Sequence, residues 1–275
     1  MTGTAEEIYP SINPYVSLAL SIFLSFQFVG GLYLFSSGNR DNPFVIKRRF
    51  QSVFVSCIIS YIVLYYLIPQ SSQRVYVFLQ VIGVMTESYL WGIILPFLLT
   101  MLLFSGPLLM AYLDYGIEEE PFDLRWLRNY VVGPTVEEVV YRSAIVPILY
   151  YGGYSTRSII IFSPLLFGLS HLHHIFPMGK KRREIIAQLL VSLLQVLYTS
   201  LFGMFTALIF VRTGNLLSCI LVHSFCNMMG LPRFQDVPHH PHSRLLSITF
   251  VLGLVGFFYY LPLLIHPVYF NSLFI

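Results

Sequence analysis

The sequence predicts an all-α polytopic membrane protein, in which about eight transmembrane helices enclose a cavity open to the cytosol and to the bilayer. Only 11% of its 275 residues are charged, whereas soluble domains carry roughly 25%. Several apolar runs approach the roughly 20 residues that a helix needs to cross a bilayer, and the mean hydropathy is +0.72. These observations favour a membrane protein over a soluble one.

The predicted spans follow one another along the whole chain, which leaves no room for a separate soluble domain. They are placed at residues 15–35, 50–68, 89–113, 130–151, 157–172, 185–211, 215–229 and 245–264. The fifth and seventh are short for a span, so we expect helices that end inside the protein beside a wet cavity. Residues 1–275 are therefore treated as a single integral membrane domain, and the helices that carry chemistry are predicted within residues 130–232.

Basic residues are unequally distributed between the loops, and this predicts how the protein lies in the membrane. Of the 16 Lys and Arg residues, twelve follow odd-numbered spans, three follow even-numbered spans, and Arg142 lies inside the fourth span. By the positive-inside rule, the loops with twelve basic residues face the cytosol. Both termini then face the opposite side. The acidic run 118–120 has little weight in this rule and is interpreted as a solvated loop.

Composition also excludes other classes of protein. The net charge of +3 is small and gives no support to nucleic-acid binding. The cysteines Cys57, Cys219 and Cys226 fall in apolar runs, which favours buried thiols over a disulfide or metal framework. The N-terminal residues M-T-G-T-A-E-E lack the positive region of a cleavable signal peptide, so we expect the first apolar run to be retained as a span.

The segment P-T-V-E-E-V-V-Y-R (residues 134–142) places two carboxylates and a guanidinium inside an apolar span. A charge at the centre of a bilayer costs a few kcal/mol, so such groups indicate a functional site. On a helix, Glu138 and Arg142 stand at i and i+4 and can neutralise each other. Glu137 is rotated by about 100° from Glu138 and has no obvious partner. We predict that Glu138 and Arg142 support the structure and that Glu137 does chemistry.

Two further stretches place polar groups where apolar ones are expected. F-G-L-S-H-L-H-H (167–174) ends the fifth span with His171, and H-S-F-C-N (223–227) brings His223 and Asn227 into the seventh span. In the predicted topology these groups and the glutamates lie at a similar depth near the cytosolic face, which predicts a single site. His173 and His174 fit either a helix-end cap or a role in the site.

This combination of side chains favours hydrolysis. A glutamate is a good general base for water when its environment raises its pKa, and a neighbouring histidine can hold or polarise that water. His223 and Asn227 lie at i and i+4, so both can point at one oxygen. Two such donors are what an oxyanion hole needs. The histidines of the Pro-rich loop 235–242 are interpreted as loose metal ligands at most.

Two other functions fit the same residues. In the first, His171, His223 and a glutamate hold zinc in a metalloprotease. The sequence lacks H-E-x-x-H, and asparagine is a poor zinc ligand, so we favour a metal-free mechanism without a cofactor. In the second, the protein is a non-enzymatic channel or scaffold whose Glu–Arg pair joins helices. A transporter would show internal repeats, and none is visible.

The three motifs resemble those of a known family. E-E-V-V-Y-R matches E-E-x-x-x-R, F-G-L-S-H matches F-x-x-x-H, and H-S-F-C-N matches H-x-x-x-N. Their order and spacing resemble the type II CAAX prenyl endopeptidases, within the CAAX-protease and bacteriocin-processing family of membrane proteins. H-L-H-H, V-R-T-G and H-S-F-C-N-M-M-G are similar to the eukaryotic branch. The resemblance covers about residues 134–232.

This resemblance implies an eight-helix endopeptidase of the endoplasmic reticulum membrane, and the loop charges predict that its active site faces the cytosol. Its substrates would be farnesylated or geranylgeranylated CAAX proteins such as Ras-type small GTPases, from which it would remove the last three residues. Glu137 and His171 would activate water, and His223 and Asn227 would stabilise the oxyanion. Glu138 and Arg142 match the second acid and the base of the first motif.

Overall fold

The computed structural model describes residues 12–34, 38–70, 72–114, 121–172 and 182–275, and within these ranges the chain forms helices and no strand. Several of these helices are apolar along most of their length. The prediction of an all-α polytopic membrane protein is therefore confirmed.

Helix length separates two groups of predicted spans. The helices that are long and apolar enough to cross a membrane are α1 (Pro14–Leu34), α2 (Pro43–Leu67), α10 (Arg182–Thr213) and α12 (Ser243–Leu264). The helices α9 (Thr156–Ser170) and α11 (Leu216–Met229) are shorter, as the sequence predicts for the fifth and seventh spans. The total of eight spans stays a prediction.

The prediction that the third span is a single helix is wrong. Residues 89–113 form α4 (Tyr89–Leu103) and α5 (Ser105–Leu113), which meet at an angle of 64°. Pro107 has no N–H to donate to the preceding turn, so it fits the first turn of a new helix but not the interior of a continuous one. The bend brings α5 against α12, where the Ser105 hydroxyl donates to the Thr249 carbonyl at 3.3 Å.

Helix α2 begins earlier than predicted because the residues before it form an N-terminal cap. The side chain of Asn42 accepts a hydrogen bond from the Phe44 amide at 2.9 Å, and Pro43 occupies the first helical position. The basic run 47–49 therefore lies in the first turns of a helix instead of in a loop. A short helix, α3 (Arg74–Val81), was not predicted.

The predicted fourth span is the central element of the fold. Residues 124–151 are helical without a break, but their winding alternates between α and π. The segments are α6 (Leu124–Leu127), η2 (Arg128–Val132), α7 (Gly133–Glu138), η3 (Val139–Ile145) and α8 (Val146–Tyr151). The wider π-turns are rare and occur frequently at functional sites. Here one of them directly follows the two glutamates.

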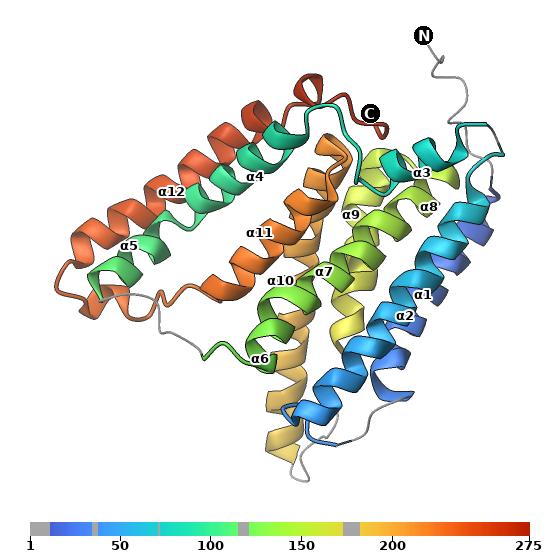
Figure 1. The fold of residues 1–275 in the computed structure, drawn as a ribbon. Helices are drawn as coiled ribbons and strands as arrows, with labels where there is room; N and C mark the ends of the chain where they lie inside the picture. The colour runs from blue at the N-terminus through green and yellow to red at the C-terminus, as the bar shows by residue number, and fades with distance from the viewer. Residues whose placement is uncertain (1–11, 35–37, 71, 115–120, 173–181) are drawn as a thin grey trace.

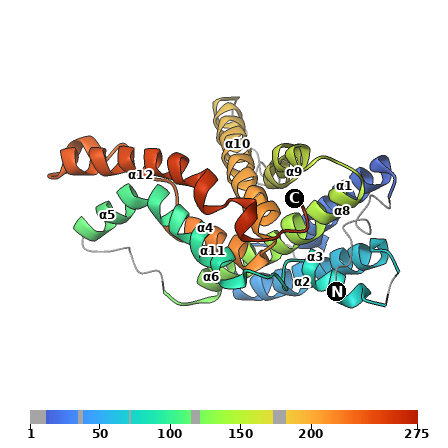
Figure 2. The same ribbon diagram turned by 90° about the horizontal axis from the view of Figure 1, so that it is seen from above.

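The other helices surround this central segment. In Figure 1, α1 and α2 lie side by side on one flank, and α12 lies with α4 and α5 on the opposite flank. Between the flanks, α9, α10 and α11 lie beside the central segment, and the view from above shows the same arrangement (Figure 2). The segments that carry the predicted site residues are therefore neighbours in the middle of the protein.

The close approach of α9 to α10 depends on glycine. A Cβ atom added at Gly168 would collide with the Ser200 hydroxyl and come within 2.8 Å of the Val196 carbonyl oxygen. On the facing helix, a Cβ at Gly203 would lie 2.9 Å from the Pro164 ring. The two helices thus contact each other through backbone, as helices in membranes commonly do at small residues.

Candidate active site

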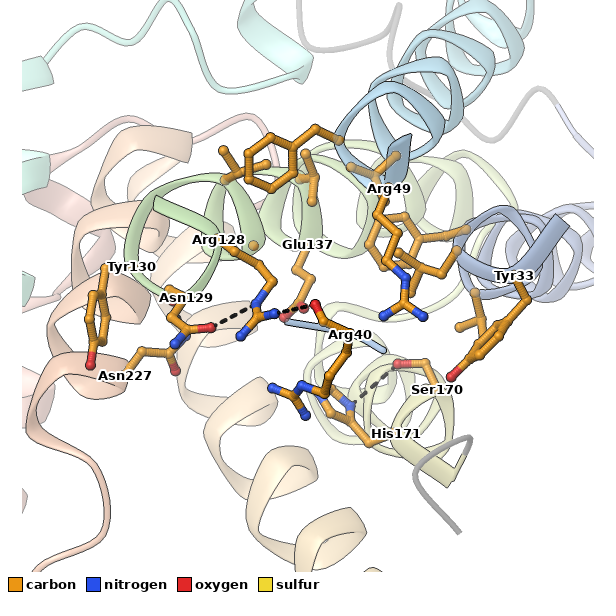
Figure 3. A pocket seen from close by; sticks show the side chains of 18 of the residues that line it. Tyr33, Arg40, Arg49, Arg128, Asn129, Tyr130, Glu137, Ser170, His171 and Asn227 are labelled. Atoms are coloured by element: carbon orange, nitrogen blue, oxygen red, sulfur yellow. Dashed lines mark hydrogen bonds between the residues drawn. The ribbon is translucent and has the colours of Figure 1, made fainter. Parts of the chain in front are cut away.

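A cavity of about 890 Å³ opens among the helices that carry the three motifs. Its wall includes Glu137 of α7, His171 at the end of α9 and Asn227 of α11 (Figure 3). The volume lies in the range of pockets that enclose small ligands. Three of the predicted catalytic residues therefore share one cavity, although they are far apart in the sequence.

Behind the cavity wall, Glu138 forms a buried charge network. The ion pair predicted from the i, i+4 spacing is present, with 3.1 Å between Arg142 Nε and Glu138 Oε2. The second oxygen, Oε1, accepts a hydrogen bond of 2.7 Å from His223 Nδ1. Both the carboxylate and the guanidinium are almost completely buried. One carboxylate thus joins the central segment to α11.

Arg142 is stabilised on its other side by an aromatic ring. Its guanidinium carbon lies 4.5 Å from the centroid of the Phe167 ring, a cation–π contact that is strongest where water is excluded. Among the described residues, its two terminal nitrogens have no hydrogen-bond partner. Phe167 is 1% exposed and also meets the Tyr141 ring edge-on. The phenylalanine of the second motif is therefore a packing residue.

Glu137, for which helical spacing offers no obvious partner, faces His223 of α11. Its Oε2 lies 3.7 Å from His223 Nε2, slightly beyond hydrogen-bond distance. The two nitrogens of the His223 ring therefore face different carboxylates, Glu138 on one side and Glu137 on the other. The Glu137 side chain is 25% exposed, so it can contact a ligand in the cavity, whereas Glu138 cannot.

His171 is held by the last turn of α9. Its Nδ1 lies 2.9 Å from the Phe167 carbonyl oxygen and 3.4 Å from the Ser170 hydroxyl. A carbonyl can only accept a hydrogen bond, so in this contact the proton is on Nδ1, and in the neutral ring the lone pair is then on Nε2. The ring also meets Phe167 edge-on at 4.9 Å. The local fold thus sets the tautomer of a histidine on the cavity wall.

Asn227 and His223 lie in different surroundings. The Asn227 amide donates to the Asn129 carbonyl at 3.0 Å and lines the cavity. His223 is 5% exposed, lies against the Phe202 ring and is not part of the cavity wall. Their convergence on one oxygen therefore stays a prediction, which requires the bound substrate to reach past Glu137.

The remaining histidines have other positions. His173 and His174 lie outside the described residues. In the Pro-rich loop, His240 Nε2 lies 3.1 Å from a carboxylate oxygen of Asp114, and Arg233 pairs with the other oxygen of the same carboxylate. Within the part of the chain that the structure describes, no group of three or more His, Cys, Asp or Glu side chains is arranged to hold a metal ion. All three cysteines are free thiols.

Sequence reasoning missed the basic residues of the cavity. Arg40, Arg49 and Arg128 all line it, but in the sequence they contributed only to the loop charges that predict orientation. Arg40 and Arg49 lie in the connection between the first two predicted spans, and Arg128 lies 88 residues after Arg40. Only the fold brings these arginines together with Glu137.

Comparisons with known proteins agree with the motifs. The family model described as "Type II CAAX prenyl endopeptidase Rce1-like" matches residues 121–229. "CAAX prenyl protease 2" of Homo sapiens is 34% identical over 287 residues, which covers 96% of this chain and 85% of the human protein. The Arabidopsis thaliana protein of the same name is 29% identical, covering 95% of this chain and 93% of its own length.

A third relative is the "Probable CAAX prenyl protease 2" of Schizosaccharomyces pombe, which is 30% identical and covers 87% of this chain and 90% of its own length. No solved structure gives a significant match. The likeness to these proteins extends over nearly the whole chain, well beyond the three motifs that surround the cavity. The chain therefore belongs to the type II CAAX prenyl endopeptidase family.

Proposed function

We propose that this protein removes the C-terminal tripeptide from prenylated CAAX proteins, using a water molecule activated by Glu137 and His171. The observation that carries this proposal is their shared cavity, in which a partly exposed carboxylate lies with a histidine whose Nδ1 is held by the Phe167 carbonyl. Family membership makes the protein a membrane endopeptidase. The relatives' names supply the class of substrate.

The proposed reaction starts with a water molecule between Glu137 and His171. Glu137 accepts a proton from the water as the oxygen attacks the carbonyl carbon of the scissile peptide bond, while His171 orients the water through Nε2. The carbonyl oxygen becomes an oxyanion. When the tetrahedral intermediate collapses, the C–N bond breaks and the proton held by Glu137 passes to the leaving amine. The products are the shortened protein and a free tripeptide.

His223 and Asn227 are proposed to stabilise the oxyanion. Since Nδ1 of His223 donates to Glu138, donation through Nε2 requires the doubly protonated ring. The carboxylates of Glu137 and Glu138 face the two nitrogens and balance that charge. Asn227 supplies the second donor from the cavity wall by turning its amide from the Asn129 carbonyl to the substrate.

The proposal is tested by incubating the purified protein with a farnesylated CAAX peptide and a strong chelator. We expect release of the intact tripeptide, detected by mass spectrometry, with an unprenylated peptide as the control. Activity that disappears with the chelator and returns with zinc would favour the metalloprotease. Absence of cleavage under all conditions would favour the non-enzymatic scaffold.

Replacing Asn227 with alanine should lower kcat with little change in KM, because the contact with the oxyanion forms only in the transition state. Loss of one oxyanion donor typically costs about 10²–10³-fold in kcat. His223→Ala should cost at least as much, and the double variant should cost less than the product of the two. Steady-state kinetics on one farnesylated peptide measures all three. A raised KM with unchanged kcat would contradict the role in the transition state.

Elemental analysis of the same preparations separates the oxyanion role from zinc binding. If His223 and Asn227 are oxyanion donors, we expect both single variants to match the wild-type protein in metal content. Stoichiometric zinc in the wild-type protein, lost together with activity in His223→Ala, would contradict the metal-free mechanism.

We propose that the protein lies in the endoplasmic reticulum membrane with its cavity facing the cytosol, where it would receive Ras-type small GTPases after prenylation. Single cysteines introduced into a variant without the native thiols test this topology. Lys181→Cys, outside the described residues, should react with an impermeant reagent from the cytosolic side, and Arg157→Cys from the luminal side. The reverse pattern would contradict the proposed orientation.

A further inference from the structure

The cavity carries more positive charge than water activation needs. Arg40, Arg49 and Arg128 line its wall, and Glu137 is the only carboxylate among the described lining residues. In Figure 3 the guanidinium groups of Arg40 and Arg49 point into the same space as Glu137 and His171. A substrate bound there meets a cationic region next to the residues proposed to activate water.

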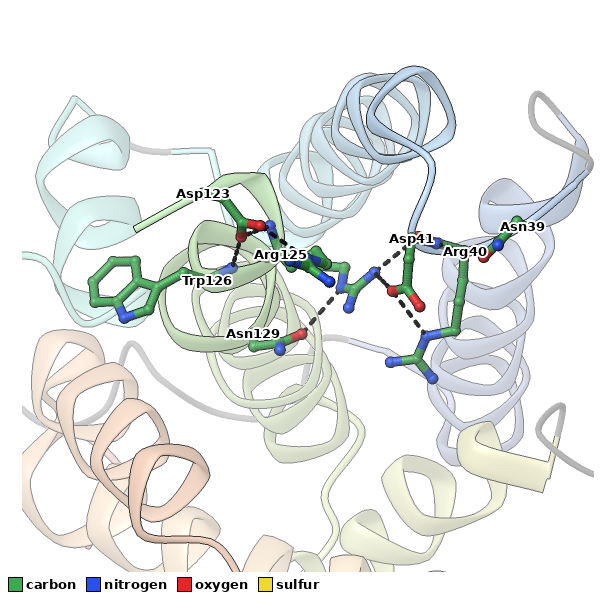
Figure 4. A network of polar contacts seen from close by, with 8 residues as sticks. Asn39, Arg40, Asp41, Asp123, Arg125, Trp126 and Asn129 are labelled. Carbon is green, nitrogen blue, oxygen red and sulfur yellow. Dashed lines mark hydrogen bonds and ion pairs between the residues drawn. The ribbon is translucent and has the colours of Figure 1, made fainter. Parts of the chain in front are cut away.

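Arg128 is engaged in holding a turn. One of its terminal nitrogens donates to the Arg40 carbonyl at 2.8 Å and to the Asp41 carboxylate at 3.0 Å, and its Nε donates to the Asn129 side chain. The hydrogen bond from Arg128 lowers the pKa of the Asp41 carboxyl. Figure 4 shows Asp41, Arg40 and Asn129 in this network. Arg128 thus fixes the backbone from which the Arg40 side chain extends.

Arg40 makes a weak ion pair, and Arg49 lies against an aromatic ring. The closest carboxylate oxygen to Arg40 Nε is that of Asp41 at 3.8 Å, and the Arg40 side chain is 59% exposed, so this ion pair contributes little. The guanidinium of Arg49 lies over the Tyr33 ring, 5.5 Å from its centroid. Both side chains belong to the cavity wall, and a guanidinium donates from its planar edge to a carboxylate.

The substrate class supplies a matching anion. A protease that releases a C-terminal tripeptide must accommodate a free carboxylate within about 10 Å of the scissile bond, since an extended residue spans roughly 3.3–3.6 Å. Moving a carboxylate out of water is costly unless it is paired. The planar fork of an arginine binds a carboxylate through two parallel hydrogen bonds, which a lysine cannot reproduce.

We propose that Arg40 and Arg49 form the subsite that binds the C-terminal carboxylate of the substrate, and that Arg128 is a positioning residue for this subsite. This inference rests on the proposed function. It explains how an endopeptidase can measure three residues from the end of a chain. With the carboxylate held by the arginines, the third peptide bond from the end is placed beside Glu137, and longer or shorter tails are misplaced.

The experiment compares two farnesylated peptides that differ only at the C-terminus, one a free acid and the other an amide. We expect the wild-type protein to favour the acid by about 10- to 100-fold in kcat/KM, as for a hydrogen bond to a charged group. In Arg40→Ala and in the double variant with Arg49→Ala, the acid-to-amide ratio should fall towards one, mainly through a higher KM for the acid. Arg40→Lys should retain an intermediate ratio.

Arg244→Ala is the matched control, because Arg244 is an exposed basic residue at the start of α12, on the predicted cytosolic side and outside the cavity wall. It should keep the wild-type ratio. A second measurement does not depend on turnover: the free tripeptide should inhibit the wild-type protein more strongly than its amide, and Arg40→Ala should remove the difference. Each variant is accepted for comparison only if its melting temperature is close to that of the wild type.

Each outcome has a distinct meaning. If the wild-type protein cleaves neither peptide, the proposed function fails and the inference fails with it. If it cleaves acid and amide equally, or if the arginine variants keep the wild-type ratio, the carboxylate subsite is wrong and the endopeptidase stands. If Arg40→Ala loses activity equally on both peptides, and only in vesicles with anionic lipid, the arginines bind lipid phosphate and the subsite is again wrong.

Discussion

Replacing Glu137 with glutamine should abolish peptide cleavage and leave the protein folded. Glutamine has nearly the same shape but cannot accept the proton of the attacking water. General-base catalysis contributes about 10²–10⁴-fold, so less than about 1% of the wild-type kcat should remain. Stability should change little, because Glu137 is partly exposed and the His223 nitrogen that faces it lies beyond hydrogen-bond distance.

The measurement is single-turnover cleavage of a farnesylated peptide, together with a melting curve. Glu87→Gln is the matched control, because it makes the same chemical change outside the cavity. There, the Glu87 carboxylate accepts a hydrogen bond from the Asn271 side-chain amide. This variant should retain full activity. A Glu137→Gln protein with more than about a tenth of the wild-type kcat would exclude Glu137 as the essential base.

Replacing Glu138 with alanine should have the opposite profile, with the main loss in stability. The change removes the partner of Arg142 and of His223 Nδ1 at once, and both are buried. Removing one member of a buried ion pair typically costs about 3–5 kcal/mol, because the other charge is left without compensation. We expect a large fall in melting temperature and in the yield of folded protein.

A double variant shows whether the stranded charge is the cause. Glu138→Ala combined with Arg142→Met removes both charges and keeps an apolar side chain over the Phe167 ring. Replacing both members of a buried pair by apolar groups is often nearly neutral. We therefore expect the double variant to melt at a higher temperature than Glu138→Ala alone. Equal stability of Glu138→Ala and the wild type would mean that the pair contributes nothing.

The part of the site that the sequence could predict is the part that depends on a single helix. The pairing of Glu138 with Arg142 follows from their spacing of four residues, and the structure has it. The bond between Glu138 and His223 joins residues 85 positions apart. Helical periodicity carries no information about such a contact. The loop charges predicted which helix ends lie near one another. They could not predict which nitrogen atom of His223 contacts which oxygen atom of Glu138.

The features of the fold also divide into those that the sequence could predict and those that it could not. Apolar runs predicted the fold class and the positions of the long helices, because both depend on composition over about 20 residues. The bend between α4 and α5 was missed, although Pro107 is visible in the sequence, since proline inside a membrane helix is often tolerated. The early start of α2 was missed because its basic side chains resemble a loop, and the Asn42 cap outweighs them.

The long-range bond to Glu138 has a consequence for how the protein enters the membrane. In the predicted topology the central segment lies in the bilayer, where its two carboxylates and its guanidinium each oppose insertion by a few kcal/mol. Arg142 and Glu138 offset each other as soon as the helix forms. His223, however, leaves the ribosome 85 residues after Glu138. During synthesis, Glu138 therefore has Arg142 as a partner but lacks His223 until α11 has been translated.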